Sequence, residues 1–218
     1  MGTKWEQELD LMRQSRREQI MDAAYELVLE NGLISITIVD IVKKAEISRV
    51  TLYKYYNSIH EIVFDIQIRI LNEMSEQLGE KLKGKNGLEK LHDYFATFVR
   101  MYQTSPDYFR FTAMFDQFYQ SSYPTPELEE QYQSFTKQGI DLIEQIIEEG
   151  IVDGSIRAET HPAMMAQILS HIMMGTTQRI AARSEIYKTE SKVDSEALLN
   201  YLANFLTTSL TAAPSQAL

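Results

Sequence analysis

Helix-start signals recur along the whole chain, and they constrain its fold more than any other feature. Four pairs have capping-box spacing, in which a side chain satisfies a free amide at a helix start: Thr3 with Glu6, Ser15 with Glu18, Ser58 with Glu61 and Asn86 with Glu89. Ser105-Pro106 and Thr125-Pro126 place proline at a first helical position, where no hydrogen bond is lost. Because no segment alternates as strands do, the sequence predicts an all-α protein.

Helix stops divide the chain into segments. They lie at Asn31-Gly32, at residues 84–87 and 150–154, and in the polar stretch 184–194. The expected helices end near residue 30 and then span about 38–45, 49–55, 59–83, 87–104, 106–120, 126–150, 162–183 and 194–211. Residues 1–14 suit a backward extension of the first helix and a flexible arm equally well.

Two of these expected helices are short and nearly adjacent. Helices of two turns are marginal alone, so they must pack against longer neighbours, and suitable apolar residues are present: Ile36, Ile38, Ile41, Val42, Ala45 and Ile47. Only Ala45-Glu46-Ile47-Ser48 separates them. A turn this tight predicts helix-turn-helix geometry over about residues 37–56, with the second helix presented to a DNA major groove.

The second short helix lies in the sequence SRVTLYKYYNS, residues 48–58. Ser48 is the expected N-cap, and Leu52 and Tyr56 share an inward stripe. Arg49, Val50, Tyr53 and Lys54 then point outward. An arginine can bind guanine with two hydrogen bonds, a threonine methyl such as that of Thr51 can contact thymine, and tyrosine or lysine can bind phosphate. Tyrosines at this spacing also suit half-buried packing.

The charge of the chain is unevenly distributed. It has 21 Lys plus Arg against 31 Asp plus Glu, but residues 1–60 hold 8 basic and 9 acidic side chains. Residues 43–58 contain four basic side chains and one acidic one. The acidity therefore belongs to the second part of the chain and does not exclude nucleic acid as a partner. A surplus of this size is also compatible with an ordinary surface.

Several functions find no support in the sequence. The chain has no cysteine, which excludes disulfides and thiol chemistry, and its four histidines have no metal-site spacing. It has no phosphate-binding glycine loop and no nucleophile motif, so we expect no enzyme activity and no cofactor. The most apolar stretch, 163–182, is interrupted by polar residues, and the N-terminus lacks a signal-type apolar run. We expect a cytoplasmic protein without a membrane span.

The run from Arg17 to Ile62 resembles the N-terminal DNA-binding domain of the tetracycline-repressor (TetR) family of bacterial transcriptional regulators. The matching positions agree in order and spacing: Ile20, Ala23, Ala24, Gly32, Thr37, Ile41, Ala45, Ser48, Leu52, Tyr53, Tyr55, Tyr56 and Glu61. The resemblance implies a three-helix DNA-binding domain, residues 1–65, joined by a long fourth helix to a helical effector-binding and dimerisation domain, residues 66–218.

The resemblance also implies which residues contact DNA. Residues matching Thr37 and Tyr55 lie near phosphates in the family, and those matching the outward face lie near bases and backbone. The predicted DNA-binding set is Thr37, Ser48, Arg49, Val50, Thr51, Tyr53, Lys54 and Tyr55. Two positions depart from the family pattern. Glu46 stands where many members have glycine, and Ile59 stands where a lysine usually binds a phosphate, a loss for which Arg16 and Arg17 are candidate compensation.

The second part must then supply a dimer interface and an effector pocket. Apolar residues on the last two long helices predict the interface: Ile168, Ile172, Leu199, Leu202 and Leu206. Clustered aromatic residues and one acid predict a pocket for a lipophilic or aromatic effector: Phe98, Tyr102, Phe111, Phe115, Asp116, Tyr119 and Phe135. An intrachain core is the alternative for the interface and for most of the rings, and a solvated surface position is the alternative for Asp116.

The predicted function is a ligand-responsive regulator that binds palindromic operator DNA as a homodimer. Repression is adopted because it is the commoner mode in the family. The alternative is a helical ligand-binding or protein-interaction module whose helix-turn-helix is not sequence-specific.

Overall fold

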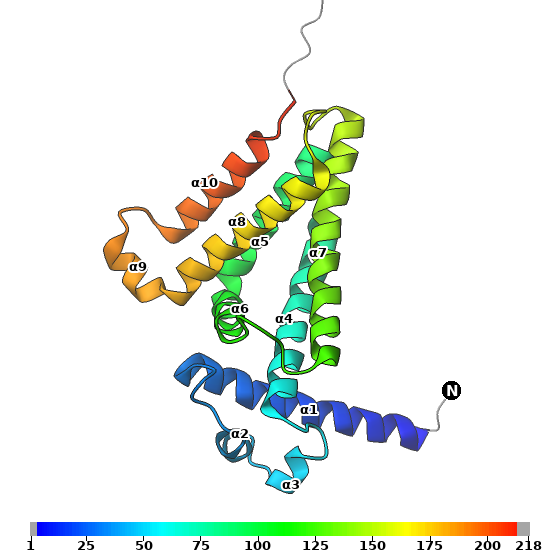
Figure 1. The fold of residues 1–218 in the computed structure, drawn as a ribbon, viewed down its shortest axis with the longest axis vertical. Helices are drawn as coiled ribbons and strands as arrows, with labels where there is room; N and C mark the ends of the chain where they lie inside the picture. Colours follow the sequence, from blue (N-terminus) through cyan, green and yellow to red (C-terminus); the bar gives the residue numbers. More distant parts are fainter. Residues whose placement is uncertain (1–3, 213–218) are drawn as a thin grey trace, which may run out of the picture. The chain divides into compact units, whose positions relative to one another are not determined.

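The computed structural model describes residues 4–212, and these form an all-α fold, as predicted. In this range the only β-type pairing is an isolated bridge between Ile156 and Thr211. Helices follow one another in chain order (Figure 1): α1 Lys4–Asn31, α2 Ile38–Lys44, α3 Arg49–Leu52, α4 Ile59–Lys81, α5 Gly87–Thr104, α6 Pro106–Phe118, α7 Pro126–Asp153, α8 Pro162–Ala182, α9 Ser184–Glu190 and α10 Ser195–Thr208.

The chain divides into two compact units. Within the described residues, the N-terminal unit comprises 4–70 together with 114–132, and the C-terminal unit comprises 71–113 together with 133–212. The helix-turn-helix lies wholly in the N-terminal unit. Sequence analysis does not anticipate that residues 114–132 join this unit, and the predicted domain boundary at residue 65 stays a prediction.

Most of the predicted helix starts are confirmed. The Ser58 hydroxyl accepts a hydrogen bond from the Glu61 amide at 3.2 Å, and the Asn86 side chain accepts one from the Glu89 amide at 2.9 Å. Helices α6 and α7 begin at their prolines. The start expected at Ser15 is wrong, because Ser15 lies inside α1, which runs unbroken from Lys4. Thr3, the cap expected before Glu6, lies outside the described residues.

Two further corrections concern short helices. The polar stretch from 184 was predicted to be a break, but it contains α9, which buries none of its residues and is flanked by an Arg183–Glu190 ion pair at 3.1 Å. The second short helix was predicted over 49–55 but ends at Leu52. Beyond it the chain continues as tight turns, in which the amide of Lys54 bonds the carbonyl of Thr51 and that of Tyr55 bonds the carbonyl of Leu52.

The N-terminal unit packs its core against one face of α1. Ile20, Ala24 and Val28 are fully buried there at four-residue steps, and α1 contacts α2. From α2, Ile41 is fully buried, and Tyr56 closes the helix-turn-helix with 1% of its surface exposed. Burial of this apolar surface holds two helices that are too short to be stable alone.

The turn between α2 and α3 has a left-handed residue where a glycine is common in similar proteins. Glu46 has φ +52°, and among the described residues it is the one non-glycine residue with positive φ. This backbone strains any residue with a Cβ, by about 1–2 kcal/mol. The departure at Glu46 therefore leaves the turn geometry intact and costs stability.

Replacing Glu46 by glycine is expected to raise the free energy of unfolding by about 1 kcal/mol, because glycine adopts positive φ without strain. Urea denaturation measures this change. Glu46→Ala is the control, since alanine keeps the Cβ and therefore the strain. Equal stability of the glycine and alanine variants would contradict the assignment of strain to this position.

The C-terminal unit is built on α5, α8 and α10, which contact one another pairwise (Figure 1). Each contributes fully or nearly fully buried apolar side chains: Leu91 and Phe95 from α5, Leu169 and Met173 from α8, and Leu199 and Leu206 from α10. Asp194 caps α10, accepting hydrogen bonds from the amides of Glu196 and Ala197 at 3.0 Å each.

Candidate functional site

Helix α3 exposes a face whose orientation is fixed by an N-terminal cap and by a buried residue on the opposite face of the helix. The Ser48 hydroxyl accepts a hydrogen bond from the Thr51 amide at 3.0 Å, which confirms Ser48 as the N-cap. Leu52, at 0% exposure, anchors the opposite side of the helix. Ser48 and Thr51 hydroxyls also lie 2.9 Å apart, so both side chains are ordered by local contacts.

The residues predicted to contact DNA lie together around this helix. Arg49, Lys54, Val50 and Tyr53 are exposed, the last two at 70% and 54%, whereas Thr51 and Tyr55 are half-buried. Val50 lies on α3 itself, and Tyr53 is the residue that caps its C-terminal end. The structure therefore brings these side chains to one protruding edge of the N-terminal unit.

Thr37 occupies a complete capping box at the start of α2. Its hydroxyl donates to the Asp40 carboxylate at 2.6 Å, and its amide donates to the same carboxylate at 3.0 Å. These hydrogen bonds from Thr37 lower the pKa of Asp40. The hydroxyl proton of Thr37 is therefore already donated to Asp40. Thr37 can donate it to a DNA phosphate only if the capping box opens.

Arg17 connects α1, the end of the helix-turn-helix and α4. Its guanidinium donates to the Asp65 carboxylate at 2.6 Å and lies 4.7 Å from the centre of the Tyr56 ring. The Tyr56 hydroxyl donates to the same carboxylate at 2.9 Å. The hydrogen bond to Asp65 raises the pKa of Arg17. Arg17 is therefore a positioning residue. Of the basic pair, only Arg16, which bonds the Gln19 side chain, forms no ion pair with a described carboxylate.

Three further contacts orient α2 on α1. The Gln19 amide donates to the Ala45 carbonyl at 2.8 Å, and Lys44 contacts the carboxylates of Glu26 and Glu30 at 2.8 and 3.0 Å. These carboxylates raise the pKa of Lys44. They also neutralise it, so Lys44 supports the framework rather than the interface.

The start of α4 differs from the lysine-bearing pattern of similar proteins. Ile59 is half-buried there, and the Glu61 carboxylate accepts hydrogen bonds from the Asn57 backbone and side chain, at 2.8 and 3.1 Å. An anion at this helix start would meet a carboxylate already in place. The Glu61 carboxylate therefore disfavours phosphate binding by the free amides at the start of α4.

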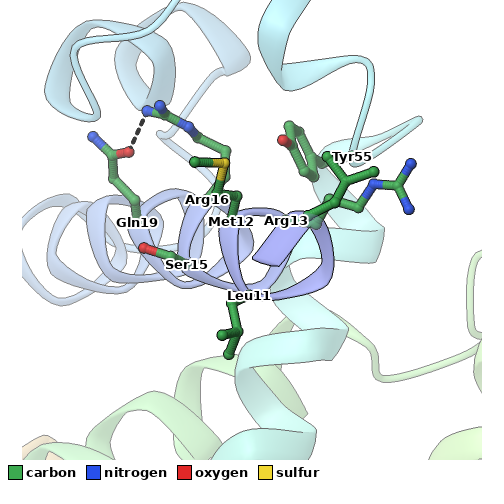
Figure 2. Close-up of a pocket in the computed structure, with 8 residues that line it drawn as sticks. Leu11, Met12, Arg13, Ser15, Arg16, Gln19 and Tyr55 are labelled. Carbon is green, nitrogen blue, oxygen red and sulfur yellow. Dashed lines mark hydrogen bonds between the residues drawn. The ribbon is translucent and has the colours of Figure 1, made fainter. Parts of the chain in front are cut away.

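Tyr55 stands over α1 rather than over solvent (Figure 2). A hollow of about 650 Å³ between them is lined by Leu9, Leu11, Met12, Arg13, Ser15, Arg16, Gln19 and Tyr55. A second hollow, of about 340 Å³, is lined by Arg13, Arg17, Lys54 and Tyr55. Sequence analysis does not single out Arg13, because its partners are distant in the sequence. The four-residue step from Leu9 to Arg13 places both side chains on one face of α1, and this spacing could have indicated that they line the same hollow.

Of the predicted effector-pocket residues, three lie in the N-terminal unit. Phe115 and Tyr119 surround Phe64 of α4, with ring centres 4.9 and 5.1 Å from it, and the Tyr119 hydroxyl lies 2.8 Å from Nδ1 of His60. Asp116 is exposed. The pKa values of Tyr123 and Tyr132 are raised mainly by the burial of their hydroxyl groups and secondly by the negative charge of Asp116. These rings form one cluster around Phe64, which we call the Phe64 cluster: Phe64, Phe115, Tyr119, Tyr123 and Tyr132.

The other four lie in the C-terminal unit. Phe98 and Tyr102 of α5 contact the Phe109 ring at 5.7 and 6.3 Å, and the Tyr102 hydroxyl donates to Ser195 at 3.3 Å. Phe111 is fully buried and Phe135 is half-buried. The structure therefore places the seven residues in separate groups, with Phe98 and Tyr102 packed around Phe109.

The predicted interface residues also separate by burial. Ile168 and Ile172 of α8 are exposed, at 40% and 39%, and Leu202 of α10 is half-buried. Leu199 and Leu206 are buried against their own chain. The apolar side chains that α8 and α10 do expose include Tyr201 and Phe205, at 75% and 59%.

The described residues offer no group of three or more His, Asp or Glu side chains that could hold a metal ion. No helix within residues 4–212 has the length and apolar character to cross a membrane.

Residues 20–66 match the family model described as "Bacterial regulatory proteins, tetR family". This match covers α2, α3 and the adjoining parts of α1 and α4, which are the elements that carry the candidate interface. It confirms the resemblance seen in the sequence. Among curated proteins no significant sequence match is found.

Solved structures share the fold over nearly the whole chain. A tetR-family regulator from Agrobacterium tumefaciens is 17% identical, with a TM-score of 0.71 over 92% of this chain and 100% of its own. The fatty acid degradation regulator of Bacillus halodurans is 18% identical, with a TM-score of 0.67 over 88% and 94%. A ketosteroid transcriptional regulator of Mycobacterium tuberculosis is 17% identical, with a TM-score of 0.66 over 91% and 96%. The chain therefore has the fold of TetR-family DNA-binding transcriptional regulators.

Proposed function

We propose that this chain, whose residues 20–66 match the family model of tetR-type bacterial regulatory proteins, is a ligand-responsive repressor. It binds a palindromic operator as a homodimer in the cytoplasm and is released by a small lipophilic effector. Residues 1–65 act as the DNA-binding domain, and residues 66–218 supply dimerisation and effector response.

One observation carries the DNA-binding part of this proposal. A four-residue helix capped by Ser48 and anchored by Leu52 exposes Arg49 and Val50, and the next residue, Tyr53, is exposed beside them. A helix this short is not stable alone. Its exposed side chains include an arginine and apolar groups that can contact base edges. Its framework is held by Arg17, Asp65 and Tyr56, so the side chains meet DNA in a fixed orientation.

The contacts divide by chemistry. Arg49 reads a guanine, and Val50 with the methyl group of Thr51 contacts thymine methyl groups. Tyr53, Lys54, Tyr55 and Ser48 bind phosphates and position the domain, and Thr37 joins them where a phosphate displaces the Asp40 carboxylate from its hydroxyl. Because Thr51 and Tyr55 are half-buried, their exposed atoms contact DNA at the margin of the interface.

The apolar faces of α8 and α10 support a homodimer. Ile168 and Ile172 follow one another at a four-residue step and are exposed, as are Tyr201 and Phe205 on α10. A second copy covering these side chains would pair two helices from each protomer. Leu199 and Leu206 contribute by fixing α10 on its own protomer, and Leu202 lies at the margin.

The effector is proposed to act through the Phe64 cluster. Phe64 is followed directly by Asp65, which holds Arg17 and Tyr56, and His60 one turn earlier contacts Tyr119. A lipophilic ligand that inserts among Phe115, Tyr119 and their neighbours would shift this part of α4 and so the helix-turn-helix framework. The names of two similar proteins, a fatty acid degradation regulator and a ketosteroid regulator, support a lipophilic effector class.

A ligand can shift DNA affinity only if it binds the two conformations with different affinity. Operator affinity measured with and without a saturating ligand tests this coupling. Unchanged operator affinity at saturation would contradict it and would favour the alternative of a ligand-binding module without regulated DNA binding.

Replacing Arg49 by alanine is expected to weaken the preferred operator by about 1–3 kcal/mol, roughly 5- to 150-fold, and random duplex much less. The reason is that a bidentate contact to guanine is lost only where that guanine is present. Binding constants on both duplexes measure the difference.

Lys43→Ala is the matched control, because it removes one exposed positive charge from α2 without touching α3. If Lys43→Ala weakens binding at all, its affinity for the operator and its affinity for random duplex should fall by similar factors. If Arg49→Ala behaves in the same way as this control, Arg49 binds a phosphate and does not read a base.

A further inference from the structure

The first half of α1 extends beyond the matched domain, and we propose that it carries an additional DNA phosphate site. Arg13, Lys54 and Tyr55 form this site, in the hollow of about 340 Å³ between α1 and the residues that follow α3. The inference rests on the proposed function only in taking duplex DNA as the partner, and it assigns a residue outside residues 20–66.

The extension is not explained by packing. No residue from Lys4 to Gln19 is buried, whereas Ile20 and Ala24 are fully buried. Trp5, Leu11 and Met12 are exposed at 69%, 65% and 71%. Arg17 and Gln19 hold the end of this stretch through Asp65 and the Ala45 carbonyl, but the turns from Lys4 to Gln14 gain little from the core, so a partner outside the protomer is a natural source of their stability.

The buried stripe of α1 continues into this extension as basic side chains. Counting back from Ala24 and Ile20 at three- and four-residue steps leads to Arg16 and Arg13. These positions therefore share the face that packs under the helix-turn-helix. Figure 2 shows Arg13 and Met12 beside Tyr55, whereas Leu11 points to the opposite side of α1.

The hollow is rich in positive charge that carboxylates neutralise only in part. Arg17 is paired with Asp65 at 2.6 Å, but Arg13 meets Asp10 only at an exposed 3.4 Å contact, and no described carboxylate forms an ion pair with Lys54. Arg16, which lines the neighbouring hollow of about 650 Å³, bonds the neutral amide of Gln19 at 2.5 Å. A guanidinium, an ammonium and a phenol hydroxyl are the donors that hold a phosphodiester.

A phosphate here replaces an anchor that the chain otherwise lacks. The helix start of α4 offers an apolar residue, Ile59, and a carboxylate, Glu61, in place of a cation. Arg13 supplies a cation from the other side of Tyr55. The expected consequence is a wider contact with the DNA backbone and no change in which bases are read.

Arg13→Gln tests this site through the salt dependence of binding. Each phosphate contact contributes about 0.9 to the slope of log affinity against log salt, so a dimer that loses two contacts should show a slope shallower by about 1.8. Affinity should fall by roughly 10- to 100-fold at 0.1 M salt, equally for operator and random duplex. Arg100→Gln, the same charge change on an exposed position of α5, should leave the slope unchanged.

Three results would overturn the phosphate site. They are an unchanged slope in Arg13→Gln, an equal change in Arg100→Gln, and a loss confined to the operator, which would make Arg13 a base-reading residue. Arg13→Lys, which keeps the charge, should recover most of the slope. If the wild type shows no preference for any sequence, the proposed regulator function fails, whereas the slope on random duplex still decides the role of Arg13.

Discussion

Replacing Leu52 by alanine is expected to lower the stability of the helix-turn-helix by about 2–5 kcal/mol and to abolish operator binding. Leu52 is fully buried, and α3 is a four-residue helix that contacts α2. Removing its side chain leaves a cavity under a helix that has no stability of its own. The outward side chains would then lose their fixed orientation.

Amide hydrogen exchange across residues 38–56 measures the local loss, and an operator-binding assay measures its consequence. Val50→Ala is the matched control, because Val50 lies on the same helix but is 70% exposed. Its exchange rates should stay near those of the wild type. If Leu52→Ala retained both protection and operator affinity, the account of α3 as a core-anchored reading helix would be wrong.

The second large effect is expected at Gly87, the first residue of α5. A Cβ added there would overlap the backbone of Gly150 on α7 and would lie 2.6 Å from the carbonyl oxygen of Ile146. Backbone atoms cannot rotate away, so α5 and α7 would have to separate. Gly87→Ala should therefore destabilise the C-terminal unit by about 3 kcal/mol or more, at the upper end of overpacking costs.

Thermal or urea denaturation measures this loss. Gly139→Ala is the control, since Gly139 lies inside α7 with nothing within 4 Å of an added Cβ, and alanine there should stabilise by up to about 1 kcal/mol. Opposite signs for the two substitutions would confirm the close approach. A neutral Gly87→Ala would show that the two backbones do not meet.

The helix-turn-helix was predictable because its signals are local. Ser48 and Ser58 mark helix starts by hydrogen bonds to amides three residues away, and the inward pair Leu52 and Tyr56 follows from helical spacing. Both inward residues are buried, at 0% and 1%. The outward residues that share this segment are correspondingly exposed or marginal.

Other features depend on contacts that no local pattern reveals. Helix α9 buries nothing, so it has no apolar periodicity to predict it. The strain at Glu46 arises because the turn keeps a left-handed residue although glycine is absent. Ser15 and Glu18 have capping spacing but lie within α1, because a helix start also requires the preceding residues to be non-helical.

The second part of the chain shows the same limit. Apolar periodicity cannot separate a face that packs within the protomer from one that is open to a partner. Leu199 and Ile172 satisfy the same pattern, yet the first is fully buried and the second is 39% exposed. Likewise, Phe98 and Phe115 are both buried aromatic residues, and only tertiary contacts assign them to different units.

Selection of bound fragments from a random duplex pool tests the central claim, sequence-specific operator binding by the α3 edge, most directly. We expect the wild type to enrich a palindrome with half-sites about one helical turn or a multiple of it apart. Arg49→Ala should enrich fragments in which one guanine position in each half-site has become random. Enrichment of no sequence over the starting pool, by a folded wild-type protein that still binds duplex DNA, would contradict it.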